Sequence, residues 1–246
     1  MKIIKLDAIN STNEYLKNYI QDKSIRNSHA VYTFNQTKGK GQRGKTWLSE
    51  PEKNLAFSIC FFPKNLKVND QFCLNMTVSL FIINTLKSLK IPNLSIKWPN
   101  DILSGEKKIC GILNEIKVKG NMIDNIIIGF GINVNQDNFE NLPNASSLKL
   151  IKNINYDLDV LVSLIIQDLK SYNCLKTFSE QELKTLHNNY YKNLYGTSKF
   201  ETFIDSNNIV FKGKIISVDR SGVVKIKKKD TSVKNYNFHE IQMIFN

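Results

Sequence analysis

Apolar and polar residues alternate along the chain with two periods, and these periods predict most of the secondary structure. Short apolar runs predict six strands, at residues 3–6, 30–34, 55–62, 94–98, 107–119 and 122–133. The last two are joined at Gly120-Asn121, which predicts a hairpin turn. Helical spacing of apolar residues predicts a helix over 70–89, and Ser11 or Thr12 is placed to cap a shorter helix that contains Glu14.

The pattern changes towards the C-terminus. Residues 157–175 and 179–195 have helical spacing, with Asp157 and Ser179 as the expected caps. After Gly196, short alternating runs are broken by Asp, Ser, Asn and Gly, which predicts a small all-β unit of about 50 residues. We therefore expect an α+β protein with two domains, residues 1–195 and 196–246.

Composition narrows the class of protein. The chain has 246 residues, of which 41% are hydrophobic and 23% charged, as is ordinary for a globular protein. It contains no run of about 18 apolar residues, and residues 1–10 are too short and mixed for a signal peptide. We expect a cytoplasmic protein that does not enter a membrane. Its four dispersed cysteines and three histidines predict free thiols and no metal cage.

The formal net charge of +12 is the next feature to interpret. Of the 34 basic residues only three are arginines, Arg26, Arg43 and Arg220. Reading of DNA bases favours arginine, because its fork pairs with guanine through two hydrogen bonds. The charge therefore favours solubility, or attraction to an acidic partner, over recognition of DNA sequence.

Residues 38–47, KGKGQRGKTW, carry three glycines and four cations without an acid. Glycines let backbone N–H groups approach an anion and cations neutralise phosphate, so this loop is typical of phosphate binding. It does not match the Walker A pattern, and its GxGxxG lacks the helix of a dinucleotide site. A flexible surface loop is the alternative from composition alone.

Three further motifs follow at strand ends. In KWPND, residues 97–101, Pro99 ends the strand, and Asn100 and Asp101 form a turn whose side chains face a site beyond it. In KKICGILNE, residues 107–115, Lys107 and Lys108 point to opposite faces of a strand, so at most one serves the same site. The third motif is GFGINVN, residues 129–135. Each alone is equally compatible with an architectural role.

In this order and spacing the motifs resemble the biotin–protein ligases, also known as the biotin–[acetyl-CoA-carboxylase] ligase or holocarboxylase synthetase family. The matching patterns are STN at residues 11–13, the GxGxxGxxW loop, KWPND, the KKxxGILxE strand and GxGIN. The resemblance spans Ile3 to Phe245. It implies a class II synthetase-like mixed sheet flanked by helices, followed by a small C-terminal SH3-like barrel. Because the first strand begins at Ile3, we expect the monofunctional type, without an N-terminal DNA-binding domain.

The resemblance implies a two-step reaction. The biotin carboxylate attacks the α-phosphorus of ATP to give biotinyl-5′-AMP and pyrophosphate with Mg²⁺ bound through ATP, and a lysine of a biotin carboxyl carrier domain then displaces AMP. A carboxylate is already ionised at neutral pH, so the first step needs positioning and charge neutralisation, not a general base. The expected partner is the carrier protein, with no DNA and no membrane; a homodimer is left open.

Residue roles are implied motif by motif. The residues expected to bind biotin are Ser11, Thr12, Gln36, Gly39, Lys40, Lys108 and Gly111. The residues expected to bind ATP or the adenylate are Gly41, Gln42, Arg43, Gly44, Trp47, Asn100, Lys108 and Asn133. Catalysis is assigned to Lys40, Asp101 and Lys108, with Lys97 near the acyl phosphate. Gly44, Trp98 and Gly129 have an architectural role as their alternative.

One departure from the family pattern concerns retention of the intermediate. Many members carry arginine where this chain has Gln42, which cannot supply a charge to the adenylate. Two rivals remain. A lipoate–protein ligase shares the fold and chemistry but would lack KWPND. A basic nucleic-acid-binding repressor would need a DNA-binding module.

Overall fold

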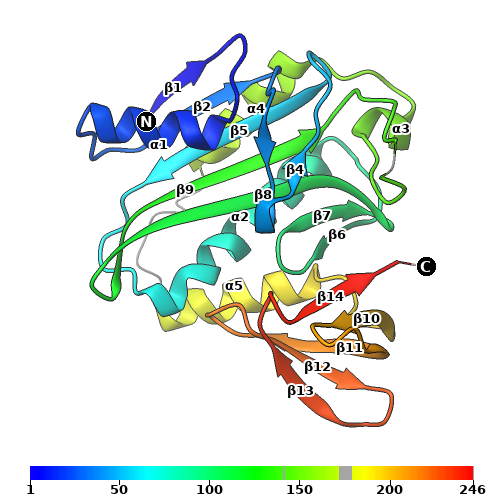
Figure 1. Ribbon diagram of the computed structural model, residues 1–246. Helices are drawn as coiled ribbons and strands as arrows, with labels where there is room; N and C mark the ends of the chain where they lie inside the picture. The colour runs from blue at the N-terminus through cyan, green and yellow to red at the C-terminus, as the bar shows by residue number, and fades with distance from the viewer. Residues whose placement is uncertain (141, 172–178, 246) are drawn as a thin grey trace.

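The computed structural model describes residues 1–140, 142–171 and 179–245 and is built around one seven-stranded sheet (Figure 1). The strands in spatial order are β1 (Lys2–Lys5), β2 (His29–Thr33), β5 (Asn54–Phe61), β9 (Met122–Asn133), β8 (Lys107–Lys119), β7 (Asp101–Ser104) and β6 (Leu94–Lys97). Only the pair β1 and β2 is parallel, and the other neighbours run antiparallel. The predicted mixed sheet is confirmed.

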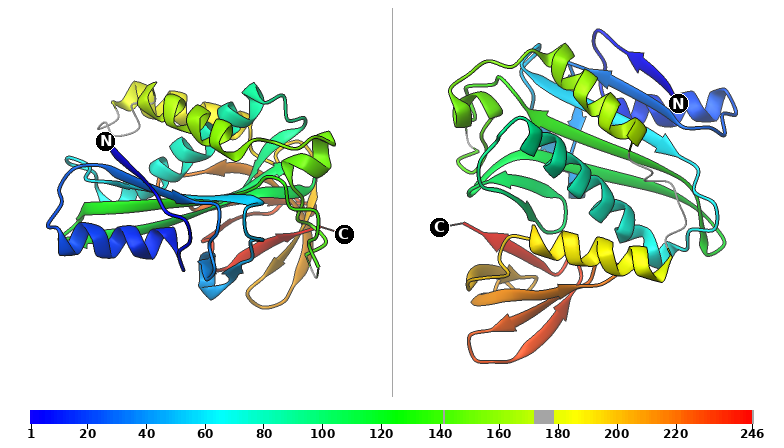
Figure 2. Two further views of the ribbon diagram at one scale, coloured as in Figure 1. Left: turned by 90° about the horizontal axis from the view of Figure 1, so that it is seen from above. Right: turned by 180° about the vertical axis from the view of Figure 1, so that it is seen from behind.

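Helices cover both faces of this sheet (Figure 2). On one face lie α1 (Thr12–Asp22) and the glycine-rich loop, which contains β3 (Gly39–Lys40), the 3₁₀ turn η1 (Gln42–Gly44) and β4 (Thr46–Trp47). On the other face lie α2 (Gln71–Ser88), α4 (Leu158–Ser171) and α5 (Glu180–Lys192), with the short turn η2 (Val68–Asp70) before α2. Fourteen of the 18 residues of α2 are buried, as expected of a helix that is apolar on most sides.

The C-terminal part forms a separate five-stranded sheet. Its strands are β10 (Glu201–Asp205), β11 (Val210–Val218), β12 (Val224–Lys228), β13 (Val233–Tyr236) and β14 (Ile241–Ile244), in the order β13-β12-β11-β10-β14. The indole Nε1 of Trp98 donates to the carbonyl of Gly222 at 3.0 Å and so joins the two sheets. The all-β unit is confirmed as a sheet, whereas its closure into an SH3-like barrel and the boundary at residue 195 stay predictions.

Most element boundaries agree with the hydrophobic pattern. The strands over 107–119 and 122–133 have the predicted bounds, and Ser179 caps α5 in a capping box with Glu182. The predicted end of the preceding helix at residue 175 lies outside the described residues. No helix in the described part of the chain has the length and apolar character that crossing a membrane requires.

Several short elements were not predicted from the hydrophobic pattern. The turn occupies residues 98–100, and Asp101 is already the first residue of β7, because it pairs with Lys97 on one side and Gly111 on the other. Such long-range pairing leaves no local period. The same holds for β3, β4, β10 and β13 and for the short helix α3 (Leu148–Lys152), none of which the pattern indicated.

Candidate active site

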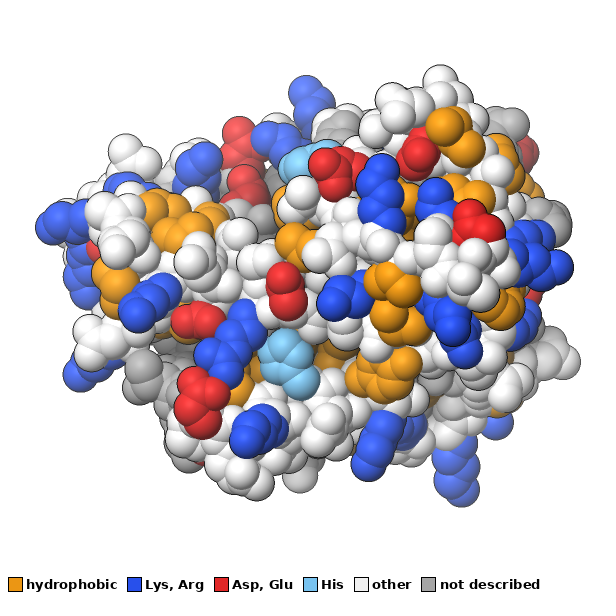
Figure 3. Space-filling view, turned by 90° about the horizontal axis from the view of Figure 1, so that it is seen from below, with side chains coloured by type: hydrophobic (Ala, Val, Ile, Leu, Met, Phe, Trp, Pro, Cys, Tyr) orange, Lys and Arg blue, Asp and Glu red, His pale blue; other side chains and the backbone are white. Residues whose placement is uncertain are grey.

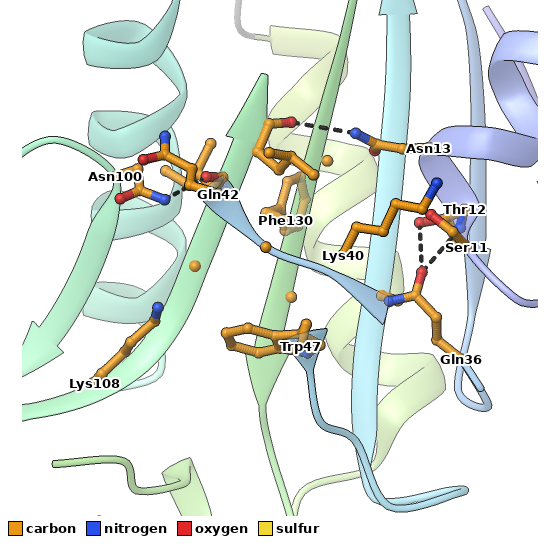
Figure 4. A pocket seen from close by; sticks show the side chains of 17 residues that line it. Ser11, Thr12, Asn13, Gln36, Lys40, Gln42, Trp47, Asn100, Lys108 and Phe130 are labelled. Atoms are coloured by element: carbon orange, nitrogen blue, oxygen red, sulfur yellow. Dashed lines mark hydrogen bonds between the residues drawn. The ribbon is translucent and has the colours of Figure 1, made fainter. Parts of the chain in front are cut away.

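Two adjoining cavities open on the sheet face that carries α1 and the glycine-rich loop. The first lies between the N-terminus of α1, the loop, and strands β8 and β9 (Figure 4). Of the predicted site residues, it is lined by Ser11, Thr12, Gln36, Lys40, Gly41, Gln42, Trp47, Asn100, Lys108 and Gly111. Motifs that are more than 100 residues apart in the chain therefore line one cavity.

The polar end of this first cavity is built by the start of α1. Ser11 is the N-cap, and its Oγ accepts from the N–H of Glu14 at 3.5 Å. The backbone N–H of Thr12 donates to Oε1 of Gln36 at 2.9 Å, and the Thr12 hydroxyl lies 3.2 Å from the same oxygen. Since Oε1 faces Thr12, the Nε2 of Gln36 keeps its N–H groups for other acceptors.

The indole of Trp47 lies across the middle of the cavity. A Cβ atom on Gly131 would lie 2.5 Å from the indole Cε2, and one on Gly111 would lie 2.9 Å from its Cζ3. Only glycine lets the ring approach the sheet this closely at both positions. With the ring there, about 60 Å³ of the cavity is open to water.

Lys108 stands where the two cavities meet. Its Nζ lies 2.7 Å from Oδ1 of Asp101 and 5.4 Å from the centre of the Trp47 ring. The neighbouring Lys107 points elsewhere, and its Nζ donates to the carbonyl of Pro143 at 2.5 Å. The two lysines therefore face different surroundings, as the strand period predicts.

The second cavity is larger, with about 390 Å³ open to water. It holds three lysines, Lys45, Lys97 and Lys108, and the amide of Asn133. Burial lowers the pKa of Lys97, partly opposed by the charge of Asp101, and its Nζ lies 4.3 Å from the centre of the Phe245 ring.

Asn133 is buried on the wall of the second cavity. Its Nδ2 donates to the carbonyl of Ser146 at 3.0 Å, whereas its Oδ1 has no partner among the described residues. Buried acceptors are rarely left unpaired, so this oxygen is a candidate acceptor for a ligand N–H group in the neighbouring cavity.

Two predicted residues, Gly39 and Gly44, line neither cavity. Gly39 packs behind Trp47, with its Cβ position 2.5 Å from the Trp47 carbonyl, and Gly44 is exposed. Lys40 pairs with Glu14 at 2.7 Å, which raises the pKa of Lys40 and lowers that of Glu14. The side chain of Arg43 lies outside the described residues.

Sequence reasoning also missed some of the wall. Asn13 and Gly131 line the first cavity and Trp98 lines the second. They belong to the STN, GFGINVN and KWPND motifs, so these motifs could have indicated them. Other lining residues belong to no motif and gave no such signal. In the second cavity these are Phe139, Leu142, Pro143, Asn144, Ile241, Gln242, Met243 and Phe245.

The polar pocket and the lysine-lined pocket share Lys108, an arrangement that can position two ligands side by side and neutralise negative charge between them. The comparison with protein families agrees. The model of the "Biotin/lipoate A/B protein ligase family" matches residues 6–133, and the chain belongs to this family.

Individual relatives extend the comparison. The chain is 29% identical over 180 residues to the "Bifunctional ligase/repressor BirA" of Escherichia coli, covering 72% of this chain and 54% of that protein. It is 25% identical over 241 residues to the protein of that name from Bacillus spizizenii, covering 96% of this chain and 72% of that one. Among solved structures, the biotin protein ligase of Aquifex aeolicus in complex with biotin and ATP matches with a TM-score of 0.79 at 25% identity, over 100% of this chain and 99% of that one.

Proposed function

We propose that this chain is an ATP-dependent biotin–protein ligase. It would activate biotin as biotinyl-5′-AMP, release pyrophosphate, and transfer the biotinyl group to a lysine of a biotin carboxyl carrier domain, with AMP as the second product. One observation carries the proposal: Gly41, Gln42, Trp47, Asn100 and Lys108 line both cavities, so ligands in the two cavities would meet beside the Lys108 ammonium group.

The first cavity suits the polar ring of biotin. Thr12 and Gln36 offer a hydroxyl and an amide at its closed end, and a cyclic urea needs both donors and acceptors. The carboxylate at the other end of the ligand would then point to Lys108. Lipoate has no polar group for the closed end, which favours biotin between the two substrates that the family name includes.

Lys108 is the residue to which we assign charge neutralisation in the first step. Its cation would sit between the attacking carboxylate and the α-phosphate, where negative charge accumulates in the transition state. Asp101, at 2.7 Å, holds the ammonium group in position. Loop backbone N–H groups and Lys40 would add neutral and charged donors to the same centre.

The second cavity suits the nucleotide. The unpaired Oδ1 of Asn133 can accept an exocyclic N–H of adenine, and Lys45 and Lys97 can face phosphates. Asp101 is the one carboxylate lining this cavity in the described part of the chain, and Lys108 already neutralises it. Mg²⁺ would therefore be held through the ATP phosphates, and no described group of three His, Cys, Asp or Glu residues could form a protein-only site. When bound, the ion would add positive charge to the phosphates.

The setting of the reaction is part of the same proposal. We place it in the cytoplasm, where ATP is supplied and where the buried free thiols of Cys60, Cys73 and Cys110 stay reduced. The acceptor would be a biotin carboxyl carrier protein. We expect no DNA binding from this chain, and a homodimer is compatible with the proposal.

Pyrophosphate release tests the proposed substrate directly. The protein is incubated with ATP and Mg²⁺ and either biotin or lipoate, without DNA. We expect release that depends on biotin. Release with lipoate and not with biotin would reject the assignment in favour of a lipoate ligase.

A further inference from the structure

A chain of buried hydrogen bonds runs from Glu115 to the cavity and reaches it at Thr12. Oε2 of Glu115 lies 2.7 Å from Nδ2 of Asn13, whose Oδ1 lies 2.6 Å from Oγ of Ser58. The same Ser58 oxygen lies 2.7 Å from Oγ1 of Thr12. The three inner members are each at least 96% buried, and Glu115 at the outer end is partly buried.

The position of each proton in this chain follows from the groups at its outer end. Nδ2 of Asn13 faces the Glu115 carboxylate and the carbonyl of Leu113, which are both acceptors, so the Asn13 amide can be oriented only with its oxygen towards Ser58. An amide oxygen cannot donate, and Ser58 therefore donates its single proton to Asn13. Ser58 is then left as an acceptor for Thr12.

The hydroxyl of Thr12 is consequently committed as well. Its proton points to Ser58 at 2.7 Å, because the Gln36 oxygen is farther away, at 3.2 Å, and already accepts the backbone N–H of Thr12. With this proton used inside the protein, the Thr12 hydroxyl offers only oxygen lone pairs to the cavity. A ligand atom opposite Thr12 must then be an N–H or O–H donor.

The packing of the sheet makes room for this arrangement. Ser58 on β5 is paired in register with Gly129 on β9, and a Cβ atom on Gly129 would lie 2.1 Å from Oδ1 of Asn13. Glycine at 129 thus admits the Asn13 side chain between helix α1 and the sheet.

We propose that Glu115, Asn13 and Ser58 are positioning residues that fix the Thr12 hydroxyl as a hydrogen-bond acceptor, so that the first cavity selects a ring that presents an N–H to Thr12. This inference rests on the proposed function, in which that ring is the cyclic urea of biotin. It adds a second criterion of selection to that function. The cavity would select biotin by the N–H donor of its ring as well as by shape, and would reject rings that lack this donor.

The test compares biotin with its two cyclic carbamate analogues, in each of which one ring N–H is replaced by oxygen. The shape is nearly unchanged, but oxygen would oppose the lone pairs of Thr12. KM and kcat for ligand-dependent pyrophosphate release are measured with the wild type, Ser58→Ala and Ser104→Ala. Ser104 is the matched control, since its Oγ donates at 2.7 Å to the carbonyl of Pro92, away from both cavities.

The wild type should discriminate against one analogue by about a hundredfold or more in KM, because unpaired polar groups in a built site are heavily penalised. In Ser58→Ala the Thr12 proton is free to turn to the ring oxygen, and this discrimination should fall at least about tenfold. Discrimination against the other analogue, and both ratios in Ser104→Ala, should stay unchanged.

A second pair of variants tests the inference if the Ser58→Ala protein does not fold. Glu115 is only partly buried, and Glu115→Gln keeps a side-chain acceptor for Asn13, whereas Glu115→Leu leaves Asn13 only the longer contact to the carbonyl of Leu113 at 3.4 Å. The inference predicts that Gln retains the discrimination and Leu loses it. Unchanged ratios in Ser58→Ala or in Glu115→Leu overturn the inference, while a wild type that releases no pyrophosphate with biotin rejects the proposed function itself.

Discussion

Replacing Lys108 by alanine should slow adenylate formation by about a hundredfold or more. The Lys108 Nζ lies 2.7 Å from Oδ1 of Asp101, and the two side chains are only 33% and 20% exposed. Loss of one charge-assisted contact to the reacting groups costs about 1.5–3 kcal/mol. The substitution also leaves Asp101 without its cation beside an incoming phosphate, and repulsion of like charges near a protein surface adds to that cost. A total near 2.7 kcal/mol corresponds to about a hundredfold in rate.

The assay is single-turnover release of pyrophosphate with saturating biotin and ATP, which separates the chemical step from product release. Lys107→Ala is the matched control, because that lysine contacts the carbonyl of Pro143 and not the cavity, and it should cost little. The double variant Lys108→Ala with Asp101→Asn should recover part of the loss, since the uncompensated carboxylate is gone. Equal effects of Lys107→Ala and Lys108→Ala would refute the reasoning, as would no recovery in the double variant.

Three further outcomes are expected. Gln42 lines both cavities, so Gln42→Arg should add a charge-assisted contact and slow the dissociation of preformed biotinyl-AMP about tenfold to a hundredfold. Identical dissociation rates in the wild type and the variant would mean that position 42 does not contact the intermediate. Because burial lowers the pKa of Lys97, this lysine should lose its charge at a lower pH than an exposed lysine, and KM for ATP should rise as the pH increases through that range. A Lys97→Gln variant that keeps this rise would exclude Lys97 as the cause. With a net charge of +12, the rate of biotinyl transfer to an acidic carrier domain should fall between low and moderate salt, while the rate of adenylate formation changes much less. A transfer rate that does not depend on salt would show that electrostatic steering does not contribute.

One face of the molecule shows basic side chains in the dispersed arrangement that the steering prediction requires (Figure 3). On the face seen in Figure 3, lysines and arginines are scattered among acidic and hydrophobic side chains and do not form one continuous stripe. A dispersed charge attracts an acidic partner over a distance without setting a register on a nucleic-acid backbone. The salt dependence should therefore appear in the rate of encounter with the carrier.

The sequence predicted those elements whose stability is local. Strands β8 and β9 have long apolar runs and a Gly120-Asn121 turn between them, so both their bounds and their pairing were readable. Strand β7 has only four residues and exists through pairing with β6 and β8, which no local period records. Strand β10 was missed for the same reason, as it is paired on both sides by β11 and β14.

The candidate site divides in a similar way. Thr12, Gln36 and Lys108 were indicated by motifs, and the structure brings them to one cavity. The contact between Asn13 and Glu115 joins residues 102 positions apart and depends on how α1 crosses the sheet, so spacing could not indicate it. Phe245 reaches the second cavity only because the C-terminal sheet folds back to it.

The most direct test of the central claim is mass spectrometry of a biotin carboxyl carrier domain after incubation with this protein, ATP, Mg²⁺ and biotin. We expect that one biotinyl group is added to a single lysine of the carrier, that none is added without ATP, and that Lys108→Ala adds far less at matched time. A carrier that stays unmodified with biotin, or that is modified only when lipoate replaces biotin, would refute the proposed function.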